Sequence, residues 1–584
     1  MKSKHFLGFI LLSQIVLGCR VQTGFDTPYQ PSKFVHKAGS ILVDENEKEY
    51  IIRGMNFSNN AYASTNFLMA TGKDHNEKSY KELSGLGFNS IRYYLNYRMF
   101  VYEGTTVESI LKNYIDKDVE YAAKYGMKII FNMHAPNGGY QSSGGGHKLW
   151  VGPDSEKNQK DLCELWKKIA LHYKNEPAVL GYGIVNEPYL IGDTYEIAIN
   201  RWTSLANRII KAIRENDKNH VIFVERAFQI KKANDENAPD ESFSYGKSID
   251  FSSEQGYPKI YDSNYAYEIH FYDPGEFTNQ GRGSYTKDFY WPDEENIIAV
   301  YNRKPVSTPQ LTSQSLSTAE NNLNKWQTLQ TPFYKISGTG KNVSNWKLIC
   351  ARLGNSSQKG KLFIDSLEII EKKSETGEEN VIYTENFSEG KGGFESSGCE
   401  IKNIEYPSIS NTGVLLIEGS DSYAQILNNT NLVILNPGFE YSLKITCLLE
   451  NSIGNNTSIY ADFIPCSADF RYYNRDFLAS SIKTFSNLSK SWKVPFYVGE
   501  YGLYIYCFAK NGTNPVEACQ KGGGQYVKDI ISVFRENNLN FSYHCYHEPG
   551  FALYYDNWTA CPSEIPETRI NELYDAFEIS LKDF

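Results

Sequence analysis

The feature that most constrains the fold is a repeated alternation of short apolar runs with longer amphipathic ones. Helical periodicity precedes most of the apolar runs, as in residues 195–217 (YEIAINRWTSLANRIIKAIREND) before the run 221–228. Parallel strands need long crossovers of this kind, and eight such strands close into a barrel. The alternation therefore predicts an α/β fold, a (β/α)8 TIM barrel. Its strands are expected at 50–59, 89–97, 128–136, 179–188, 221–228, 265–274, 494–502 and 540–548.

The alternation is interrupted between the sixth and seventh runs. Residues 303–463 lose helical periodicity, become rich in Ser, Asn, Gly and Thr, and carry eight short alternating runs. Short strands separated by turn residues are typical of an antiparallel sandwich. We therefore expect an all-β jelly-roll sandwich inserted in the barrel, which divides the barrel into residues 34–302 and 464–584.

Polar side chains collect at the ends of the apolar runs. The fourth run, within VLGYGIVNEPYL (179–190), ends on Asn186 and Glu187, and the seventh carries Glu500. The other candidates are Arg92 in the second run, His134 in the third, and His270 and Tyr272 in the sixth. Catalytic groups gather at the C-terminal ends of the strands in a TIM barrel, so these residues are predicted to share one site.

Two glutamates at such ends suit glycoside hydrolysis. A retaining mechanism uses one carboxyl as acid/base and another as nucleophile, about 5–5.5 Å apart. Mutual repulsion helps to raise the pKa of the acid, and nearby Arg and His side chains favour an ionised nucleophile. The alternatives are structural: Arg92 as partner of a barrel carboxylate, and His134 and His270 as core histidines.

The motifs GYGIVNEP, VPFYVGEYG, NSIRYYLN, MHAPNGG and YEIHFYDP together resemble glycoside hydrolase family 5, the cellulase family. The resemblance covers residues ~36–292 and ~470–575. It implies Glu187 as acid/base and Glu500 as nucleophile, with Asn186 bonding the sugar 2-hydroxyl. It also implies that Arg92 and Tyr272 flank the nucleophile and that His134 and His270 line the subsite.

The sequence departs from the family's pattern near the end of the eighth run. The family usually places there a tryptophan on which the sugar stacks, whereas this chain has SYHCYHE (542–548). His544 is the preferred occupant of that position, with Tyr543 and Tyr546 as alternatives. Read as a metal cluster, HCYHE lacks further ligands nearby, and no CxxC or HExxH motif occurs, so neither metal nor cofactor is expected.

Aromatic residues make up 14% of the chain, and exposed rings often bind sugar faces. Trp150 follows a Gly-rich loop, GGYQSSGGGHKLW (138–150), where it either stacks on sugar or packs the loop; Trp291 poses the same alternatives. In the insertion, GKLFIDSLEII and TENFSEG resemble parts of carbohydrate-binding jelly-roll modules. Residues 326–370 resemble the last part of such a module yet precede 381–394, which resemble the first. We expect either a circularly permuted sandwich or an ordinary one.

The N-terminus is predicted to direct export. Lys2 and Lys4 precede an apolar run, and VLGC resembles a lipoprotein cleavage box. Residues 1–18 would be a lipoprotein-type signal peptide, Cys19 the lipid anchor and 19–33 a tether; the alternative is an ordinary signal peptide of a secreted protein. Export permits disulfides, and Cys507–Cys519 and Cys545–Cys561 are the plausible pairs.

The function expected from these features is retaining hydrolysis of β-glycosidic bonds in a polysaccharide by a cellulase or endo-β-glucanase type of enzyme, acting as a monomer. A β-mannanase, an exo-β-glucosidase and a glycolipid hydrolase remain open, because loops set specificity on this fold. An alternative of another class is a non-catalytic carbohydrate-binding lipoprotein. A net charge of −10 without a basic block argues against nucleic acid as a partner.

Overall fold

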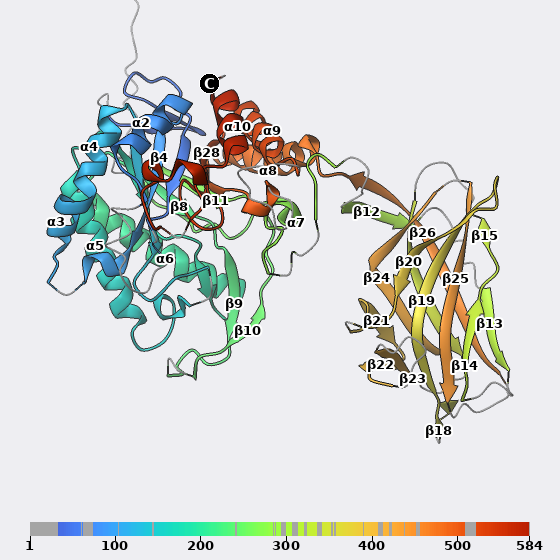
Figure 1. Cartoon of the computed structure of the whole chain (residues 1–584). Coiled ribbons are helices and arrows are strands. Elements are labelled where there is room, and N and C mark those ends of the chain that lie inside the picture. The colour runs from blue at the N-terminus through green and yellow to red at the C-terminus, as the bar shows by residue number, and fades with distance from the viewer. Residues whose placement is uncertain are drawn as a thin grey trace, which may run out of the picture. The chain divides into compact units, whose positions relative to one another are not determined.

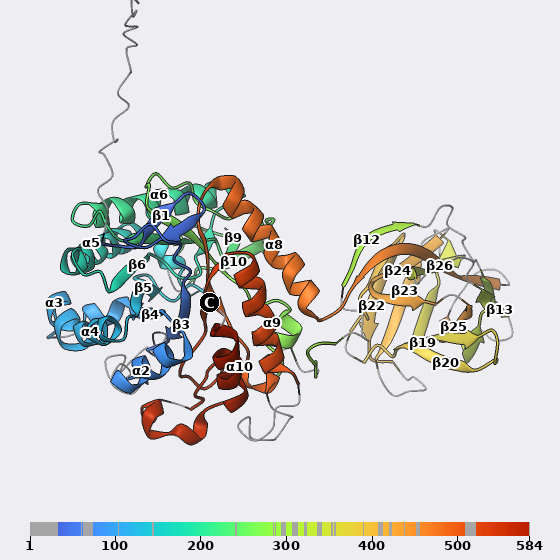
Figure 2. The ribbon, with the colours of Figure 1, turned by 90° about the horizontal axis from the view of Figure 1, so that it is seen from above.

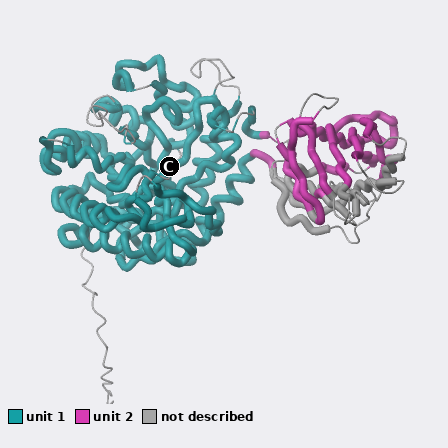
Figure 3. The backbone as a smooth tube through the Cα atoms, turned by 90° about the horizontal axis from the view of Figure 1, so that it is seen from below, with its two compact units in different colours: residues 1–292, 474–584 teal, residues 293–473 magenta. Residues whose placement is uncertain are grey.

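The protein is represented by a computed structural model in which two compact units are formed (Figures 1 and 3). One unit comprises residues 1–292 and 474–584, and the other is Asp293–Tyr473. The structure describes residues 33–59, 61, 74–102, 104–142, 145–239, 242–283, 285, 288–293, 299–305, 314–319, 324–335, 342–351, 354–355, 358–388, 390–406, 413–419, 423–436, 438–450, 456–508, 521–556, 558–582 and 584.

The first unit is a closed barrel, as the alternation predicted. Its strands neighbour one another in the order β11-β27-β28-β3-β4-β5-β6-β8, all with parallel pairing. In chain order they are β3 (Arg53–Phe57), β4 (Ser90–Asn96), β5 (Lys128–Ala135), β6 (Val179–Gly183), β8 (Val221–Glu225), β11 (Tyr265–His270), β27 (Phe496–Tyr501) and β28 (Asn540–Tyr543). The (β/α)8 prediction is confirmed.

Helices surround these strands (Figure 2). The principal ones are α2 (Glu77–Leu86), α4 (Asp116–Lys124), α5 (Ser155–Tyr173), α6 (Tyr195–Arg214), α8 (Arg475–Trp492), α9 (Gly523–Glu536) and α10 (Asn571–Leu581). Helix α6 illustrates why they form: Thr194 caps its N-terminus by accepting the Ile197 N–H, and Trp202, Ile209 and Ile213 are buried at helical spacing. The helices therefore cover the barrel with their apolar faces.

The end of the barrel opposite the strands' C-termini is closed by the N-terminal hairpin, β1 (His36–Ala38) and β2 (Ile41–Val43). Val35 and Leu42 pack there with Ile130, Leu180 and Phe223 in one buried cluster. This end is therefore a packed core, which leaves the other end for a site.

The crossover from β8 to β11 contains no α-helix among the residues described there. It instead forms a small sheet in which β9 (Gln229–Ala233) pairs with β10 (Tyr245–Ser248) and with β7 (Tyr189–Ile191). Because β7 begins two residues after Glu187, this sheet fixes the chain that leaves the fourth barrel strand.

The second unit has two antiparallel sheets with an apolar core between them. One sheet has the order β14-β25-β19-β23-β22 and the other β12-β26-β16-β24-β21. Leu362, Leu415 and Leu443 from the first sheet lie in one buried cluster with Ile426 and Leu435 from the second. The elements are β12 (Ala299–Pro305), β14 (Trp326–Gln330), β16 (Asn342–Ala351), β19 (Lys361–Lys373), β21 (Phe394–Ser397), β22 (Cys399–Ile404), β23 (Val414–Gly419), β24 (Tyr423–Leu435), β25 (Phe439–Glu450) and β26 (Asn456–Arg471).

The second unit is longer at each end than residues 303–463, the range expected from composition. Strand β12 pairs with the end of β26 from Ala299 opposite Arg471, so both segments belong to its sheet. Composition changes only after this strand pair has begun, which is why the two boundaries differ. The circular permutation stays a prediction.

The expected Cys545–Cys561 disulfide is absent, since both residues carry free thiols. Cys545 is held at the end of the barrel, where its backbone N–H donates to Phe551, and Cys561 precedes a short 3-10 turn, Pro562–Glu564. Cys519 and residues 1–32, with the signal peptide and Cys19, lie outside the described residues. Within the described part of the chain, no helix has the length and apolarity needed to cross a bilayer.

Candidate active site

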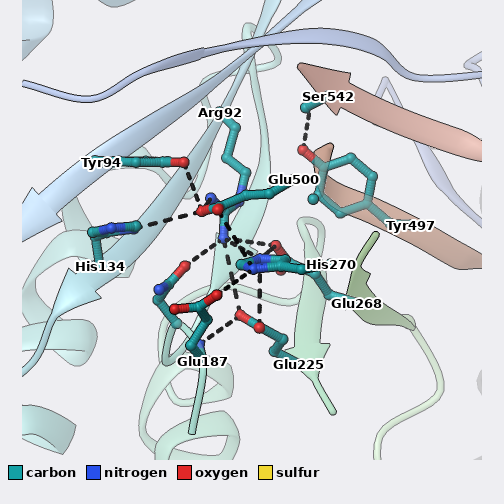
Figure 4. Close-up of polar contacts among 12 residues, drawn as sticks. Arg92, Tyr94, His134, Glu187, Glu225, Glu268, His270, Tyr497, Glu500 and Ser542 are labelled. Carbon is teal, nitrogen blue, oxygen red and sulfur yellow. Dashed lines mark hydrogen bonds and ion pairs between the residues drawn. The ribbon is translucent and has the colours of Figure 1, made fainter. Parts of the chain in front are cut away.

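The C-terminal ends of the barrel strands bring the predicted residues into one buried cluster (Figure 4). Arg92 comes from β4, His270 from β11 and Glu500 from β27, while Glu187 follows β6. One ligand atom each of Glu187, His270 and Glu500 lies within 4.8 Å of the other two. A carboxylate oxygen of Glu187 is therefore within 4.8 Å of one from Glu500.

Glu500 is surrounded by donors. Its Oε1 accepts from Arg92 Nη1 at 2.8 Å and from the Tyr94 hydroxyl at 2.7 Å, and its Oε2 accepts from the Tyr272 hydroxyl at 2.9 Å. Burial raises the pKa of Glu500, but His270, His544 and Arg92 outweigh burial and hold that pKa well below its usual range. The carboxylate is therefore ionised at neutral pH.

Arg92 is fully buried and connects Glu500 to two further groups. Its Nη2 lies 2.8 Å from both Asn186 Oδ1 and Glu268 Oε1. Because the Asn186 oxygen is thus occupied, its amide nitrogen is the side available to another molecule. That buried nitrogen has no hydrogen-bond partner within the described part of the chain.

Glu187 is held by its backbone as well as by its side chain. Its φ is +41°, a left-handed conformation that is uncommon outside glycine. The Glu187 N–H donates to Glu225 Oε2 at 2.8 Å, and Glu187 Oε1 lies 2.9 Å from His270 Nδ1. The strand therefore ends on a carboxyl that is turned into the site.

The two histidines differ in charge. Burial lowers the pKa of His270, but Glu225 and Glu500 outweigh burial and hold it well above its usual range. Burial lowers the pKa of His134 well below its usual range, so His134 is neutral. The His134 ring stacks on Tyr94, with centroids 3.8 Å apart and the planes 9° from parallel.

Three site residues were missed in the sequence: Tyr94, Glu225 and Glu268. Tyr94 lies two residues after Arg92 and Glu268 two before His270, so each shares a strand face with a predicted residue. Glu225 ends the fifth strand. The alternation of side chains along a strand was the signal that would have identified the first two.

Gly499 shows how closely the strands approach here. A Cβ on Gly499 would come within 1.8 Å of Glu268 Oε1. The Asn56 amide nitrogen donates to the Gly499 carbonyl oxygen at 3.0 Å. The same nitrogen donates to the Tyr94 hydroxyl at 2.9 Å. The glycine before Glu500 therefore leaves room for the carboxylate that bonds Arg92.

Of the three residues considered at the end of the eighth strand, His544 lies at the site. Its Nδ1 is 3.0 Å from the Tyr94 hydroxyl. Tyr543 is instead buried against Tyr501 and Phe577, and the Tyr546 hydroxyl donates to Glu82.

A metal-type arrangement occurs in HCYHE, where ligand atoms of His544, Cys545 and Glu548 lie within 4.8 Å of one another. Burial raises the pKa of the Cys545 thiol well above its usual range. A metal needs the thiolate, so this environment disfavours metal binding by Cys545.

Both candidate tryptophans pack inside the protein rather than lining the site. Trp150 is 4% exposed, its Nε1 donates to Gln141 Oε1 at 2.7 Å, and its ring packs edge-on against Trp202. Trp291 is 3% exposed and donates to Asp529. Of the two alternatives for Trp150, stacking on sugar is therefore wrong and packing of the Gly-rich loop is confirmed.

A groove of about 490 Å³ begins at the C-terminal ends of β4 and β5, on the face of the barrel that carries the site. Its lining mixes polar and apolar surface, and it includes two aromatic side chains, Tyr97 after β4 and Tyr140 after β5. Its lining comprises Asn96, Tyr97, Arg98, Ala135, Pro136, Asn137, Gly138, Gly139, Tyr140, Gly145, Lys148, Asp154 and Asn158.

The sequence profile of a known family, Cellulase (glycosyl hydrolase family 5), matches residues 43–329. This range holds the first six barrel strands and the motifs around Arg92, His134, Glu187 and His270. The chain therefore carries a glycosyl hydrolase family 5 domain. Glu500 lies beyond the matched range, and its place in the family site rests on the geometry of β27.

The curated relatives that match this chain are distant. Endoglucanase 3 of Fibrobacter succinogenes is 28% identical over 262 residues, which cover 42% of this chain and 34% of that protein. A beta-xylosidase of Phanerodontia chrysosporium is 26% identical over 229 residues, covering 33% and 46%. Endoglucanase C of Acetivibrio thermocellus is 26% identical over 208 residues, covering 35% and 52%. The chain thus spans about a third to a half of the length of these relatives.

Among solved structures, endoglucanase Cel5A from Thermotoga maritima aligns with a TM-score of 0.41 and 14% identity, over 90% of this chain and 96% of that one.

Proposed function

We propose that this protein is a retaining glycoside hydrolase that cleaves β-glycosidic bonds in a polysaccharide. The observation that carries the proposal is the separation of the two carboxylates, whose oxygens approach within 4.8 Å. Retaining enzymes hold the two carboxyl groups about 5–5.5 Å apart, whereas inverting enzymes need about 6.5–9.5 Å to admit a water.

Glu500 is the nucleophile in this proposal. Its ionised carboxylate attacks the anomeric carbon while the Glu187 carboxyl donates its proton to the departing glycosidic oxygen. Arg92, Tyr94 and Tyr272 keep the attacking carboxylate anionic and oriented. The bond to the leaving sugar breaks as the glycosyl–Glu500 ester forms.

Water then completes the reaction. Glu187, now a carboxylate, removes a proton from a water that attacks the same anomeric carbon, and Glu500 leaves. His270 donates to Glu187 at 2.9 Å and so stabilises the carboxylate form between the two steps. The free Asn186 amide nitrogen is suited to bond the sugar 2-hydroxyl, because its oxygen is already held by Arg92.

We propose a β-glucan as the substrate and internal bonds as the point of cleavage. Two of the relatives described above are endoglucanases. The groove has a volume suited to further sugar units, since ligand sites commonly measure about 300–1,000 Å³. A β-xylosidic substrate is the second candidate, supported by the beta-xylosidase relative.

The proposal is tested by the stereochemistry of the first product. Early NMR spectra of a cello-oligosaccharide digest are expected to show the β-anomer before mutarotation. Net inversion would overturn the retaining mechanism and both carboxylate roles. Release of reducing ends from soluble β-glucan, xylan and mannan, compared in one assay, separates the substrate candidates.

The second unit is proposed to bind carbohydrate and to be dispensable for hydrolysis. Its ends are neighbours, because the Asp293 N–H donates to Tyr473 O at 2.7 Å, so a short linker can close the gap at little entropic cost. Replacing residues 293–473 by a short Gly/Ser linker is expected to leave kcat/KM on a soluble aryl β-glycoside within about threefold of wild type.

The same deletion is expected to abolish binding to insoluble polysaccharide, measured by pull-down with the separately produced 293–473 segment as the matched control. An inactive but folded deletion would show that the second unit contributes to the catalytic site. Binding unchanged by the deletion would place carbohydrate recognition in the barrel alone.

We also propose that Cys19 anchors the exported protein to a membrane through lipid, supported by VLGC after a short apolar run. A lipid-modified terminus attaches a chain without a spanning helix. In a lipoprotein-processing bacterium, wild-type protein is expected to incorporate labelled palmitate and Cys19→Ala to incorporate none. Label-free wild-type protein would refute the anchor and favour secretion.

A further inference from the structure

Glu225 is a buried carboxyl that the hydrolytic steps above do not use. It ends β8 and is 3% exposed, and its carboxyl contacts two groups of the site rather than solvent. Oε2 accepts the backbone N–H of Glu187 at 2.8 Å, and Oε1 lies 3.4 Å from His270 Nε2. Figure 4 shows it on the side of His270 away from Glu500.

These two contacts converge on the same residue. His270 Nδ1 is 2.9 Å from Glu187 Oε1, so Glu225 reaches Glu187 directly through the backbone and indirectly through the imidazole. The Glu225 carboxyl forms an ion pair with His270 at Nε2, and this contact favours the charged imidazolium, in which both ring nitrogens carry protons. The Nδ1–H of that imidazolium faces Glu187.

The backbone contact has a separate role. Glu187 adopts φ +41°, which an L-residue maintains only when its surroundings impose it. The Glu225 carboxyl provides a hydrogen-bond acceptor for the N–H of this residue, at the point where β6 has ended and the strand ladder supplies none.

We propose that Glu225 is a positioning residue of the hydrolytic reaction, which aims the acid/base Glu187 by holding both its backbone N–H and the His270 imidazolium that donates to it. This inference rests on the proposed function, in which Glu187 donates and later removes the proton. The charged groups that face Glu225 are His270 and Glu268 from β11, Arg92 from β4 at 4.0 Å, and Glu187 itself.

The test compares leaving groups. In Glu225→Leu, kcat/KM is expected to fall about 100-fold on a cello-oligosaccharide, whose departing oxygen needs a proton, but to stay within about threefold on a dinitrophenyl β-glycoside, whose departing oxygen does not. A variant that had merely lost structure would lose both activities equally. The Gln side chain in Glu225→Gln has the size of Glu and offers both a hydrogen-bond acceptor and a donor. Glu225→Gln is therefore expected to restore kcat/KM on the cello-oligosaccharide to within about tenfold of wild type.

Glu268→Leu is the matched control, because it removes the neighbouring buried carboxyl, which pairs with Arg92 and lies 3.8 Å from His270 Nε2 but does not accept the Glu187 N–H. The Glu268→Leu variant is expected to change kcat/KM on the cello-oligosaccharide and on the dinitrophenyl β-glycoside by the same factor. If Glu225→Leu is insoluble, Glu225→Asp replaces it, since withdrawing the carboxyl by one methylene breaks the same contacts.

Two failures are distinguishable. If Glu187→Ala discriminates between the leaving groups and neither Glu225 variant does, the positioning role is refuted and the proposed function stands. If Glu187→Ala itself does not discriminate, the acid/base assignment fails and the inference fails with it.

Discussion

Glu500→Ala is expected to lower kcat on an aryl β-glucoside by about 10⁴-fold or more, because the variant lacks the carboxylate that attacks the anomeric carbon. Three donors converge on this carboxylate and its pKa lies well below the usual range, so the variant loses the one anion that these donors orient. Steady-state release of the phenol measures the loss.

Azide provides the control for this variant. It fits the space left by the carboxylate and attacks from the face opposite the leaving group, so the product is expected to be an α-glycosyl azide. Glu196→Ala, on the exposed first turn of α6, is the matched carboxylate control and should retain wild-type kcat. A Glu500→Ala enzyme within tenfold of wild type would contradict the nucleophile assignment.

Glu187→Ala is expected to give a loss that depends on the leaving group. General acid catalysis contributes about 10²–10⁴-fold, so kcat/KM on a cello-oligosaccharide should fall by that factor. On a dinitrophenyl glycoside the departing oxygen needs no proton, and kcat/KM should change little. A series of aryl glycosides with different leaving-group pKa values measures this as a steeper dependence of rate on that pKa.

Azide distinguishes Glu187 from Glu500 by stereochemistry. In Glu187→Ala the glycosyl–Glu500 ester still forms, and azide attacks it to give a β-glycosyl azide. An α-glycosyl azide from this variant would mean that the two roles are exchanged. Equal losses on all leaving groups would instead indicate that Glu187 has a structural role.

Much of the barrel and its site was determined by the sequence itself. Strand and helix periods are local properties, and parallel strands joined by helical crossovers leave few alternatives to a closed barrel, so the eight strands were predictable. The site followed for the same reason: the C-terminal ends of parallel strands meet at one edge. Arg92, Glu187, His270 and Glu500 were therefore predictable as neighbours despite separations of up to 408 residues.

The tertiary structure alone decided contacts between side chains from different strands. The sequence allowed Trp150 either to stack on sugar or to pack its own loop. The fold of that loop places the ring in the interior, where it bonds Gln141 and packs against Trp202. Cys545 and Cys561 have a spacing that permits a disulfide, yet backbone contacts elsewhere determine where each sulfur lies. Glu225 carries no motif, and its role arises from the geometry of β8, β11 and the turn after β6. Periodicity fixes which face a residue occupies, whereas the partner it meets on that face depends on the register between strands that are distant in the chain.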